Sequence, residues 1–357
     1  MDTSGRAHKG VLSADDMAKW TPTVEAPTTY DYGRYTVCKP GPWNQGPVML
    51  QQLALLKGYT LDGMDPTSAE FIHLLVEASK LAFADREKFY GDPNFVDVPM
   101  PTLLSDAYNA ERRTLITAQA SMDLRPGEVD GFGGVVTFRK ADASRSAVAA
   151  SGAGEPTVGR LGEARGDTVH FDIIDRDGNM VTSTPSGGWL QSSPVIPALG
   201  FPLGTRAQMF WLDEGKPGTL APGKRPRTTL TPTMALRDGE PYLAWGSPGG
   251  DQQDQWIAQF FLRHVHCGMN LQEAIDAPAW HSEHFPISFF PRTARPGVLV
   301  LEGRVPKETV KELEKRGHIV EVGDDWSEGR LTAASREGVR RKAAANPRGM
   351  QGYAAGR

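Results

Sequence analysis

Thr168 follows Gly166 and Asp167, at the point where a segment poor in large apolar residues gives way to an alternating, strand-like sequence. A threonine hydroxyl is a weak nucleophile unless a base lies beside it. The α-amino group of a chain beginning at this threonine would be such a base, since its pKa is about 8. We therefore hypothesise that the chain is cut between Asp167 and Thr168 and that Thr168 then attacks an amide. The alternative is that a hairpin simply begins there.

An attack on a carbonyl carbon also needs N–H donors for the oxyanion. The run GSPGGDQQ places Gly249 and Gly250 directly before a predicted helix. Glycine N–H groups can approach a substrate closely, and the N-terminus of a helix favours negative charge. The run lacks the lysine and the serine or threonine of a phosphate-binding loop, so we do not interpret it as a nucleotide site.

The elements that must position these residues follow from the hydrophobic pattern. Residues 168–173 alternate between polar and apolar side chains, which predicts a strand with one apolar face. Asp177-Gly178 then predicts a hairpin turn, and residues 231–246 repeat the pattern around Asp238-Gly239. Helical segments are expected at residues 251–268, 270–278 and 306–317, the first and last ending at Gly268 and Gly317.

The region before Thr168 divides into two parts. Residues 1–120 predict mixed helix and loop, with a capped helix over 13–20 and a longer helix ending near Tyr90. The longer helix is expected to start either with Asp65 as its cap and Pro66 at its first position or with a capping box of Thr67 and Glu70. Residues 121–167 are rich in Gly, Ala and Ser and predict a mobile linker that ends at the cut. Residues 168–357 then form the catalytic part.

Composition excludes several classes of partner. The 357 residues carry a net charge of −4, which favours neither nucleic acid nor an anionic membrane surface. No apolar run approaches the length of a membrane span. The N-terminus lacks the apolar core of a secretory signal, so a cytoplasmic protein is expected, although the natural beginning of the chain can be missing.

Neither a cofactor nor a metal site is expected from the sequence. The two cysteines, Cys38 and Cys267, are far apart and predict incidental thiols rather than a disulfide framework. His264, His266 and Cys267 do not have the i, i+4 spacing of a ligand pair on one helix face. His281 and His284 have no matching ligand set, so packing at helix ends and in loops is the favoured role of these residues.

Several motifs together carry a family resemblance. The runs at residues 166–181, 223–253, 270–286 and 344–357 resemble the small subunit of γ-glutamyltranspeptidases, and residues 11–37 and 77–93 resemble the C-terminal part of their large subunit. The resemblance implies an α+β fold, the four-layer αββα sandwich of N-terminal-nucleophile hydrolases. The sandwich is expected to be partial, because the N-terminal part of the large subunit has no counterpart in this sequence.

The resemblance also implies roles for individual residues. Thr168 is expected to be both the self-cleaving and the catalytic nucleophile, Gly249 and Gly250 the oxyanion hole, and Ser186 the support for the nucleophile. Thr228 and Thr229 fall where the family has two serines that hold the substrate carboxylate, and threonine keeps the hydroxyl donors.

One aromatic residue departs from the family pattern. Phe210 replaces the aspartate that pairs with the substrate amino group. With Trp189 and Trp211, Phe210 is expected to make the acyl pocket more apolar.

These roles predict a γ-glutamyltransferase or glutathione hydrolase-like enzyme that passes its acyl group from Thr168 to water or to an amine. Processing would give two subunits, as a heterodimer or a higher oligomer. Two alternatives remain open. One is an acylase for a β-lactam or an aliphatic or aryl amide, and the other is an inactive truncated precursor that serves only as a binding or assembly partner.

Overall fold

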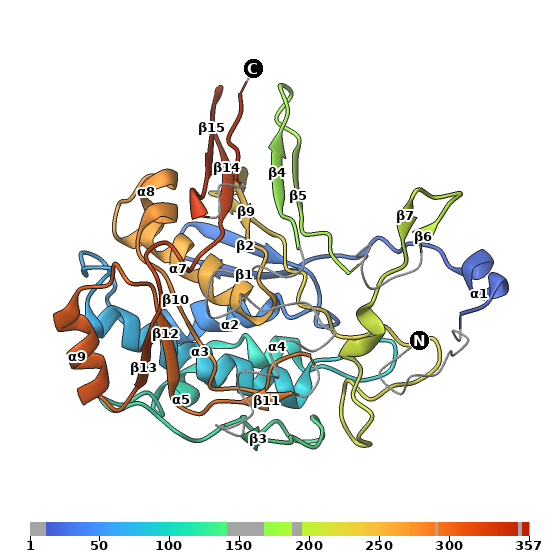
Figure 1. Ribbon diagram of the computed structural model, residues 1–357, viewed down its shortest axis with the longest axis horizontal. Coiled ribbons are helices and arrows are strands. Elements are labelled where there is room, and N and C mark those ends of the chain that lie inside the picture. Colours follow the sequence, from blue (N-terminus) through green and yellow to red (C-terminus); the bar gives the residue numbers. More distant parts are fainter. Residues whose placement is uncertain (1–11, 141–167, 188–194, 290–291, 349–351, 357) are drawn as a thin grey trace.

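The computed structural model describes residues 12–140, 168–187, 195–289, 292–348 and 352–356. Its helices and strands form a mixed α/β fold (Figure 1). The helices are α1 (Ala14–Lys19), α2 (Pro47–Leu56), α3 (Ala69–Phe89), α4 (Met100–Leu103), α5 (Asp106–Arg113), α7 (Gln253–His266), α8 (Leu271–Asp276) and α9 (Lys307–Lys315), with 3-10 turns η1 (Arg206–Met209) and η2 (Gly250–Gln252).

The largest sheet has six antiparallel strands in the order β1-β2-β8-β9-β14-β15. Two of them precede the predicted cut and four follow it, so the sheet joins both sides of the chain. The strands are β1 (Thr28–Tyr32), β2 (Tyr35–Lys39), β8 (Thr233–Arg237), β9 (Glu240–Gly246), β14 (Thr332–Glu337) and β15 (Arg340–Ala345).

The other strands form smaller sheets. Three strands pair in the order β10-β12-β13, and three further pairs are β4-β5, β6-β7 and β3-β11. Their bounds are β3 (Arg139–Lys140), β4 (Phe171–Ile174), β5 (Met180–Ser183), β6 (Val195–Ile196), β7 (Phe201–Pro202), β10 (Trp280–Ser282), β11 (Thr293–Ala294), β12 (Val298–Leu301) and β13 (Ile319–Val322).

Helices α2 and α7 pack against the six-stranded sheet, and α3 packs behind α2. The core between them is aromatic, and Trp245 of β9 stacks on Phe261 of α7 at 5.3 Å between ring centroids. The β4-β5 hairpin contacts β9 and β14, and Figure 1 shows it beside β14 and β15 at the top of the view, away from α2 and α3. None of the helices within the described ranges is long and apolar enough to cross a membrane.

The start of α3 differs from both predicted starts. Ser68 is the N-cap, and its hydroxyl accepts a hydrogen bond from the Phe71 N–H at 3.2 Å. Asp65 instead bonds the N–H of Thr67 at 2.8 Å in the preceding turn. Several good capping residues are adjacent in the sequence here. Because Asp65 and Thr67 form a turn, the helix is capped by Ser68, one residue after the predicted Thr67 cap.

Most other predicted elements are confirmed. The helix capped by Ser13, the turns at Asp177-Gly178 and Asp238-Gly239, and the helices before Gly268 and Gly317 all form.

The first part of the predicted linker is held against α3. Arg125 pairs with Glu77 at 3.0 Å, and the Gly127 N–H donates to Asp85 at 2.6 Å. Residues 139–140 end this segment as a strand paired with β11. The small residues of 121–140 thus allow close packing, whereas 141–167 lie outside the described residues.

Candidate active site

Thr168 lies at the base of the β4-β5 hairpin, where the strand enters from the predicted cut. Its side chain is buried, with 7% of the residue exposed, and its hydroxyl donates to the Ser186 hydroxyl at 2.8 Å. The Val169 N–H donates to the Pro185 carbonyl at 3.2 Å and fixes the two segments beside each other. The structure therefore brings together the two residues predicted to be nucleophile and support. Asp167 and Trp189 lie outside the described residues.

The turn at Gly249 and Gly250 presents two N–H groups at the start of η2 and α7. In the portion of the chain that the structure describes, neither N–H has a hydrogen-bond partner. Gly249 has a φ of 122°, and a Cβ built on it would lie 2.6 Å from the Trp256 ring, so only glycine fits. Two free donors at the positive end of a helix are the arrangement that an oxyanion needs.

One close contact links the Thr168 strand to this turn. The imidazole of His170 lies so close to Gly246 that a Cβ at Gly246 would overlap the ring. Thr168 lies two residues before His170, and Gly249 lies three residues after Gly246. Both are therefore within about 10 Å of that contact, given the reach of an extended chain.

Thr228 and Thr229 lie in the segment before β8, and both are buried. The Thr228 N–H donates to the Trp43 carbonyl at 3.0 Å, and its hydroxyl accepts from the Asn44 amide at 3.2 Å. The Thr229 hydroxyl has no partner among the described residues. Thr229 therefore offers an unpaired buried hydroxyl, while the hydroxyl of Thr228 already accepts a bond.

Gln45, which sequence reasoning missed, ties this segment to the glycine turn. Its N–H donates to the Thr228 carbonyl at 2.9 Å, and its side-chain amide donates to the Gly250 carbonyl at 3.1 Å. The side-chain oxygen accepts from Arg86 of α3 at 2.9 Å. A polar pair before Pro47 is a weak sequence signal, because turns commonly hold such residues.

A buried ionic cluster holds the residue that follows the glycine turn. Asp251 pairs with Arg86 and accepts from the Ser288 N–H at 2.7 Å and hydroxyl at 2.6 Å. Glu87 pairs with Arg86 at 2.8 Å and with Arg227 at 2.7 Å. Burial would raise the pKa of Glu87, but the two arginines outweigh it and lower that pKa. The paired charges of this cluster hold Asp251, and with it the adjacent Gly249–Gly250 turn, in place.

Phe210 lies at the end of η1 and is half-buried. Its carbonyl accepts from the buried Arg292 guanidinium at 2.8 Å, and that guanidinium lies over the Trp211 ring at 4.3 Å from its centroid. Burial lowers the pKa of Arg292 to about 10. Arg292 therefore fixes the backbone at Phe210.

If this site cleaves an amide, replacing Gln45 by alanine is expected to lower the turnover by about 10-fold to 100-fold, because the Gly250 turn loses a positioning bond. Folding stability should fall by about 1–3 kcal/mol, since Arg86 loses a buried acceptor. Turnover and urea denaturation measure the two effects. Gln119→Ala, at an exposed glutamine, is the matched control. Equal turnover in both variants would show that Gln45 does not position the glycine turn for catalysis.

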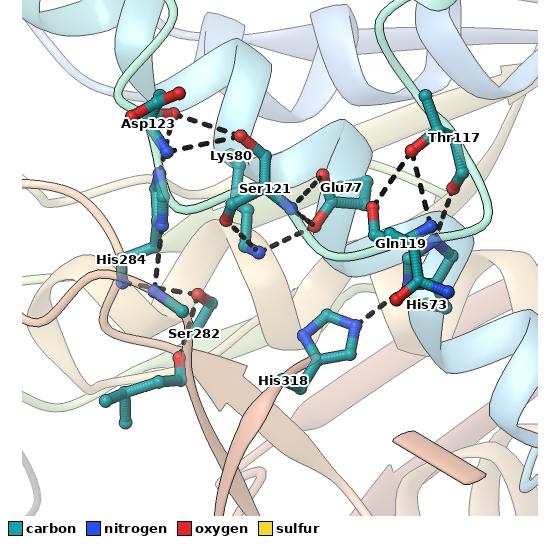
Figure 2. A network of polar contacts seen from close by, with 12 residues as sticks. His73, Glu77, Lys80, Thr117, Gln119, Ser121, Asp123, Ser282, His284 and His318 are labelled. Atoms are coloured by element: carbon teal, nitrogen blue, oxygen red, sulfur yellow. Dashed lines mark hydrogen bonds and ion pairs between the residues drawn. The ribbon is translucent and has the colours of Figure 1, made fainter. Parts of the chain in front are cut away.

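One group of three side chains in the described ranges could hold a metal ion. His73, Glu77 and His318 offer ligand atoms within 4.8 Å of one another (Figure 2). However, Glu77 already pairs with Lys80 at 2.6 Å and with Arg125 at 3.0 Å. Two cations neutralise the single carboxylate, so this arrangement favours a hydrogen-bonded structural network over a metal centre.

Burial lowers the pKa of His73, His284 and His318, so the three rings are neutral near pH 7 and their bonds then define the tautomers. His73 Nε2–H donates to the Thr117 carbonyl at 2.7 Å, so its Nδ1 accepts from His318 Nε2–H at 2.8 Å. His318 Nδ1 is then a buried acceptor without a partner among the described residues. His284 donates to the Asp123 carbonyl at 3.1 Å and accepts from the Gly297 N–H at 3.0 Å.

The protein is expected to lose stability as the pH falls below about 6.5, the ordinary histidine pKa. Burial, reinforced by Lys80, lowers the pKa of His284 to about 3 and that of His318 to about 2. Below pH 6.5 the unfolded chain therefore binds more protons than the folded chain, and each histidine removes about 1.4 kcal/mol per pH unit. The stabilisation is complete above pH 6.5.

Urea denaturation between pH 7.5 and pH 4.5 tests this effect, because the ordinary carboxylates titrate mostly below that window. His284→Gln should flatten the profile. An unchanged slope in that variant would contradict the assignment.

The other histidines considered as metal ligands make hydrogen bonds to neighbouring residues of the fold. His264 bonds the Tyr242 hydroxyl at 2.6 Å and the Met269 carbonyl at 2.7 Å. His266 bonds Asp62 at 2.6 Å, while the Cys267 thiol bonds the Met64 carbonyl at 3.6 Å.

His281 bonds Glu328 at 2.7 Å. Burial would lower the pKa of His281, but Glu328 and Glu283 outweigh it and raise the pKa to about 10.

Comparison with known proteins gives one family. The family model described as gamma-glutamyltranspeptidase matches residues 1–356. A glutathione hydrolase proenzyme of Bacillus subtilis (strain 168) is 28% identical over 314 residues, which are 87% of this chain and 49% of that protein. The acylase ACY 1 proenzyme of Pseudomonas sp. (strain SE83) is 30% identical over 316 residues, covering 88% and 49%. The chain thus spans about half the length of the curated relatives it matches.

Two solved structures resemble the whole fold. The structure of LmbA2991HD is 52% identical with a TM-score of 0.87, covering 100% of this chain and 60% of that one. A cephalosporin acylase from Bacillus halodurans is 27% identical with a TM-score of 0.76, covering 97% and 55%.

Proposed function

This chain belongs to the γ-glutamyltranspeptidase family, and we propose that it carries the catalytic part of a self-cleaving amide hydrolase or acyltransferase. The observation that carries the proposal is the hydrogen bond between the hydroxyls of Thr168 and Ser186, at 2.8 Å, which joins the two ends of the β4-β5 hairpin directly after the expected cut. The proenzyme names of the relatives support self-cleavage as the first step.

The first reaction cuts the chain. The Thr168 hydroxyl attacks the Asp167 carbonyl carbon and forms an ester, while the peptide nitrogen leaves as the α-amine of Thr168. Water then hydrolyses this ester and leaves a carboxylate on Asp167. Residues 168–357 become the catalytic fragment, and residues 121–167 remain on the N-terminal fragment, which ends at the cut.

The second reaction uses the freed amine as the base. The amine takes the proton of the Thr168 hydroxyl as the oxygen attacks a substrate amide. The N–H groups of Gly249 and Gly250 stabilise the oxyanion, the amine component leaves, and an acyl ester remains on Thr168. Water or an amine acceptor then takes the acyl group. None of these steps needs a metal or an organic cofactor.

We propose a γ-glutamyl amide, such as glutathione, as the substrate class, in line with the names of the glutathione hydrolase relatives. Thr228 and Thr229 would hold its carboxylate, and the unpaired Thr229 hydroxyl is the stronger candidate. The four-layer αββα sandwich is proposed as the complete fold, supported by the likeness to the cephalosporin acylase.

Phe210 favours an acylase for a less polar amide as the second candidate, because an apolar side chain stands where the family pattern has an aspartate. Phe210→Asp is expected to gain γ-glutamyl activity at least about 10-fold if an ion pair with the substrate amine is all that is missing. Hydrolysis of a γ-glutamyl anilide measures the gain. Phe210→Leu is the control, and a folded, cleaved Asp variant without any gain would contradict this reading of the pocket.

The proposal is tested by intact-mass measurement of the purified protein after incubation. Two fragments that join at Asp167/Thr168 are expected, and a subsequent substrate amide should add its acyl mass to the fragment beginning with Thr168. A single stable 38.8 kDa chain would contradict self-cleavage by this protein alone.

A further inference from the structure

The inner face of the β4-β5 hairpin carries a row of bonded polar side chains next to Thr168. The side chains of His170 and Asp172 are 1% and 2% exposed, and they bond each other at 3.0 Å. His170 also bonds the Thr184 hydroxyl at 2.8 Å. The pairing of the two strands continues past β4 to Thr168. Since residues two apart on a strand point to the same side, Thr168 and His170 share this face.

The row contacts two strands of the six-stranded sheet. Asp172 accepts a hydrogen bond from the Thr332 hydroxyl of β14 at 3.0 Å. The His170 ring lies against the backbone of Gly246 at the end of β9, where a Cβ would be 2.3 Å from the ring atom Cε1. Gly246 does not have a positive φ, so glycine is needed here for the space that the ring occupies and not for a turn.

Both nitrogens of the His170 ring are bonded. The Asp172 carboxylate can only accept, so Nε2 of the ring carries a hydrogen, whereas the Thr184 hydroxyl can bond Nδ1 as a donor or as an acceptor. The ring is therefore held in one orientation whichever charge it carries. Because neither nitrogen is left to take a proton from Thr168, the ring fits a role in positioning better than a role as a base.

The ring connects the strand of the nucleophile to the glycine turn. On one side, His170 is two residues from Thr168. On the other side, Gly246 ends β9 and is followed three residues later by Gly249, the first of the two oxyanion donors. A displaced ring would change the distance between the attacking oxygen and these donors. An error of about 1 Å in such a distance can cost about 100-fold in rate.

We propose that His170 is a positioning residue that sets the distance between the Thr168 hydroxyl and the Gly249–Gly250 turn. This inference rests on the proposed function, since the distance matters for the rate only if Thr168 attacks an amide. The bond to Asp172 orients the ring, and the backbone of Gly246 is the surface against which the ring packs.

A double-mutant cycle tests this role. His170→Ala removes the ring, and Gly246→Ala pushes the ring away from β9. Each variant is expected to lower kcat, expressed per cut chain, by about 10-fold to 100-fold, while KM changes by less than about 3-fold. The two effects should not multiply, because without the ring the added methyl group has nothing to displace. His170→Gln keeps a donor for Asp172 and should recover part of kcat.

The control lies on the opposite face of the hairpin. Val181→Ala, at a residue 49% exposed, should leave kcat unchanged. The far end of the hairpin is held separately, because Arg341 of β15 donates to the Arg176 carbonyl, so the variants should stay folded. Unchanged kcat in His170→Ala would overturn the proposal, and so would effects of the two alanine substitutions that multiply.

The contact of the ring with β9 can also be measured without activity. Amide hydrogen exchange of residues 168–174 is expected to rise at least about 10-fold in His170→Ala and in Gly246→Ala, including in an uncut Thr168→Ala background. Exchange at the wild-type rate would overturn the proposal. A wild type that neither cuts itself nor turns over an amide would contradict the proposed function. The exchange rates would then still decide whether the ring holds the strand of Thr168 in place.

Discussion

Replacing Thr168 by alanine is expected to stop cleavage at Asp167/Thr168 and to lower amide turnover by about 10⁴-fold or more, the loss typical of removing a covalent nucleophile. Among the described residues this hydroxyl makes one hydrogen bond, to the uncharged Ser186, so its removal leaves no charge unpaired there. The fold should therefore survive, and the effect should be confined to the chemistry.

Two comparisons make the Thr168 experiment specific. Thr168→Ser keeps a hydroxyl in place and should retain part of both reactions. Thr182→Ala removes a hydroxyl from the partner strand of the same hairpin, where it makes only a 3.5 Å contact with His170, and should be close to the wild type. Intact mass follows cleavage and product release follows turnover. An alanine variant that still cuts itself would exclude Thr168 as the nucleophile.

Replacing Arg86 by leucine should have the largest effect on stability. The guanidinium is buried and pairs with Asp251 and Glu87, and it also donates to Gln45. Its loss leaves a carboxylate beside the glycine turn buried without its cation, which costs about 3–5 kcal/mol. Urea denaturation at pH 7.5 measures this cost.

An exposed ion pair of the same type provides the control. Arg34 and Asp238 are paired with 60% and 55% of their side chains exposed. Arg34→Leu should therefore cost less than about 1 kcal/mol, since water already screens that pair. Similar costs for the two variants would mean that the Arg86 cluster does not depend on its charges. Arg86→Lys should lie between the two, because a lysine keeps the charge but loses the fork of donors.

Local chemistry explains which parts of the fold could be predicted. The turns at Asp177-Gly178 and Asp238-Gly239 are encoded by two adjacent residues and form as expected. The start of α3 could not be predicted, because Asp65, Thr67 and Ser68 are all good caps and only one is used. The alternation over 168–173 is apparent in the sequence, but it does not say which face meets water.

The candidate site divides in the same way. Thr168, Ser186 and the glycine turn belong to motifs that can be read in short stretches, and the structure places Ser186 against Thr168. Gln45 could not be found in this way, since its partners Arg86, Thr228 and Gly250 are distant in sequence and meet it only after folding. The same holds for the cluster around Asp251.

The pairing of β2 with β8 has a consequence for how a cleaved protein would refold and how long it would stay folded. Tyr35 to Cys38 pair with Met234 to Arg237, and Lys39 of β2 pairs with the buried Asp254 of α7 at 3.1 Å. The proposed cleavage at Thr168 would leave these neighbours in two molecules instead of one. Refolding would then be a bimolecular reaction whose yield falls on dilution. Once cut, the protein would stay folded only as long as it unfolds slowly. Its lifetime would then depend on the rate of unfolding and not on the free energy of unfolding.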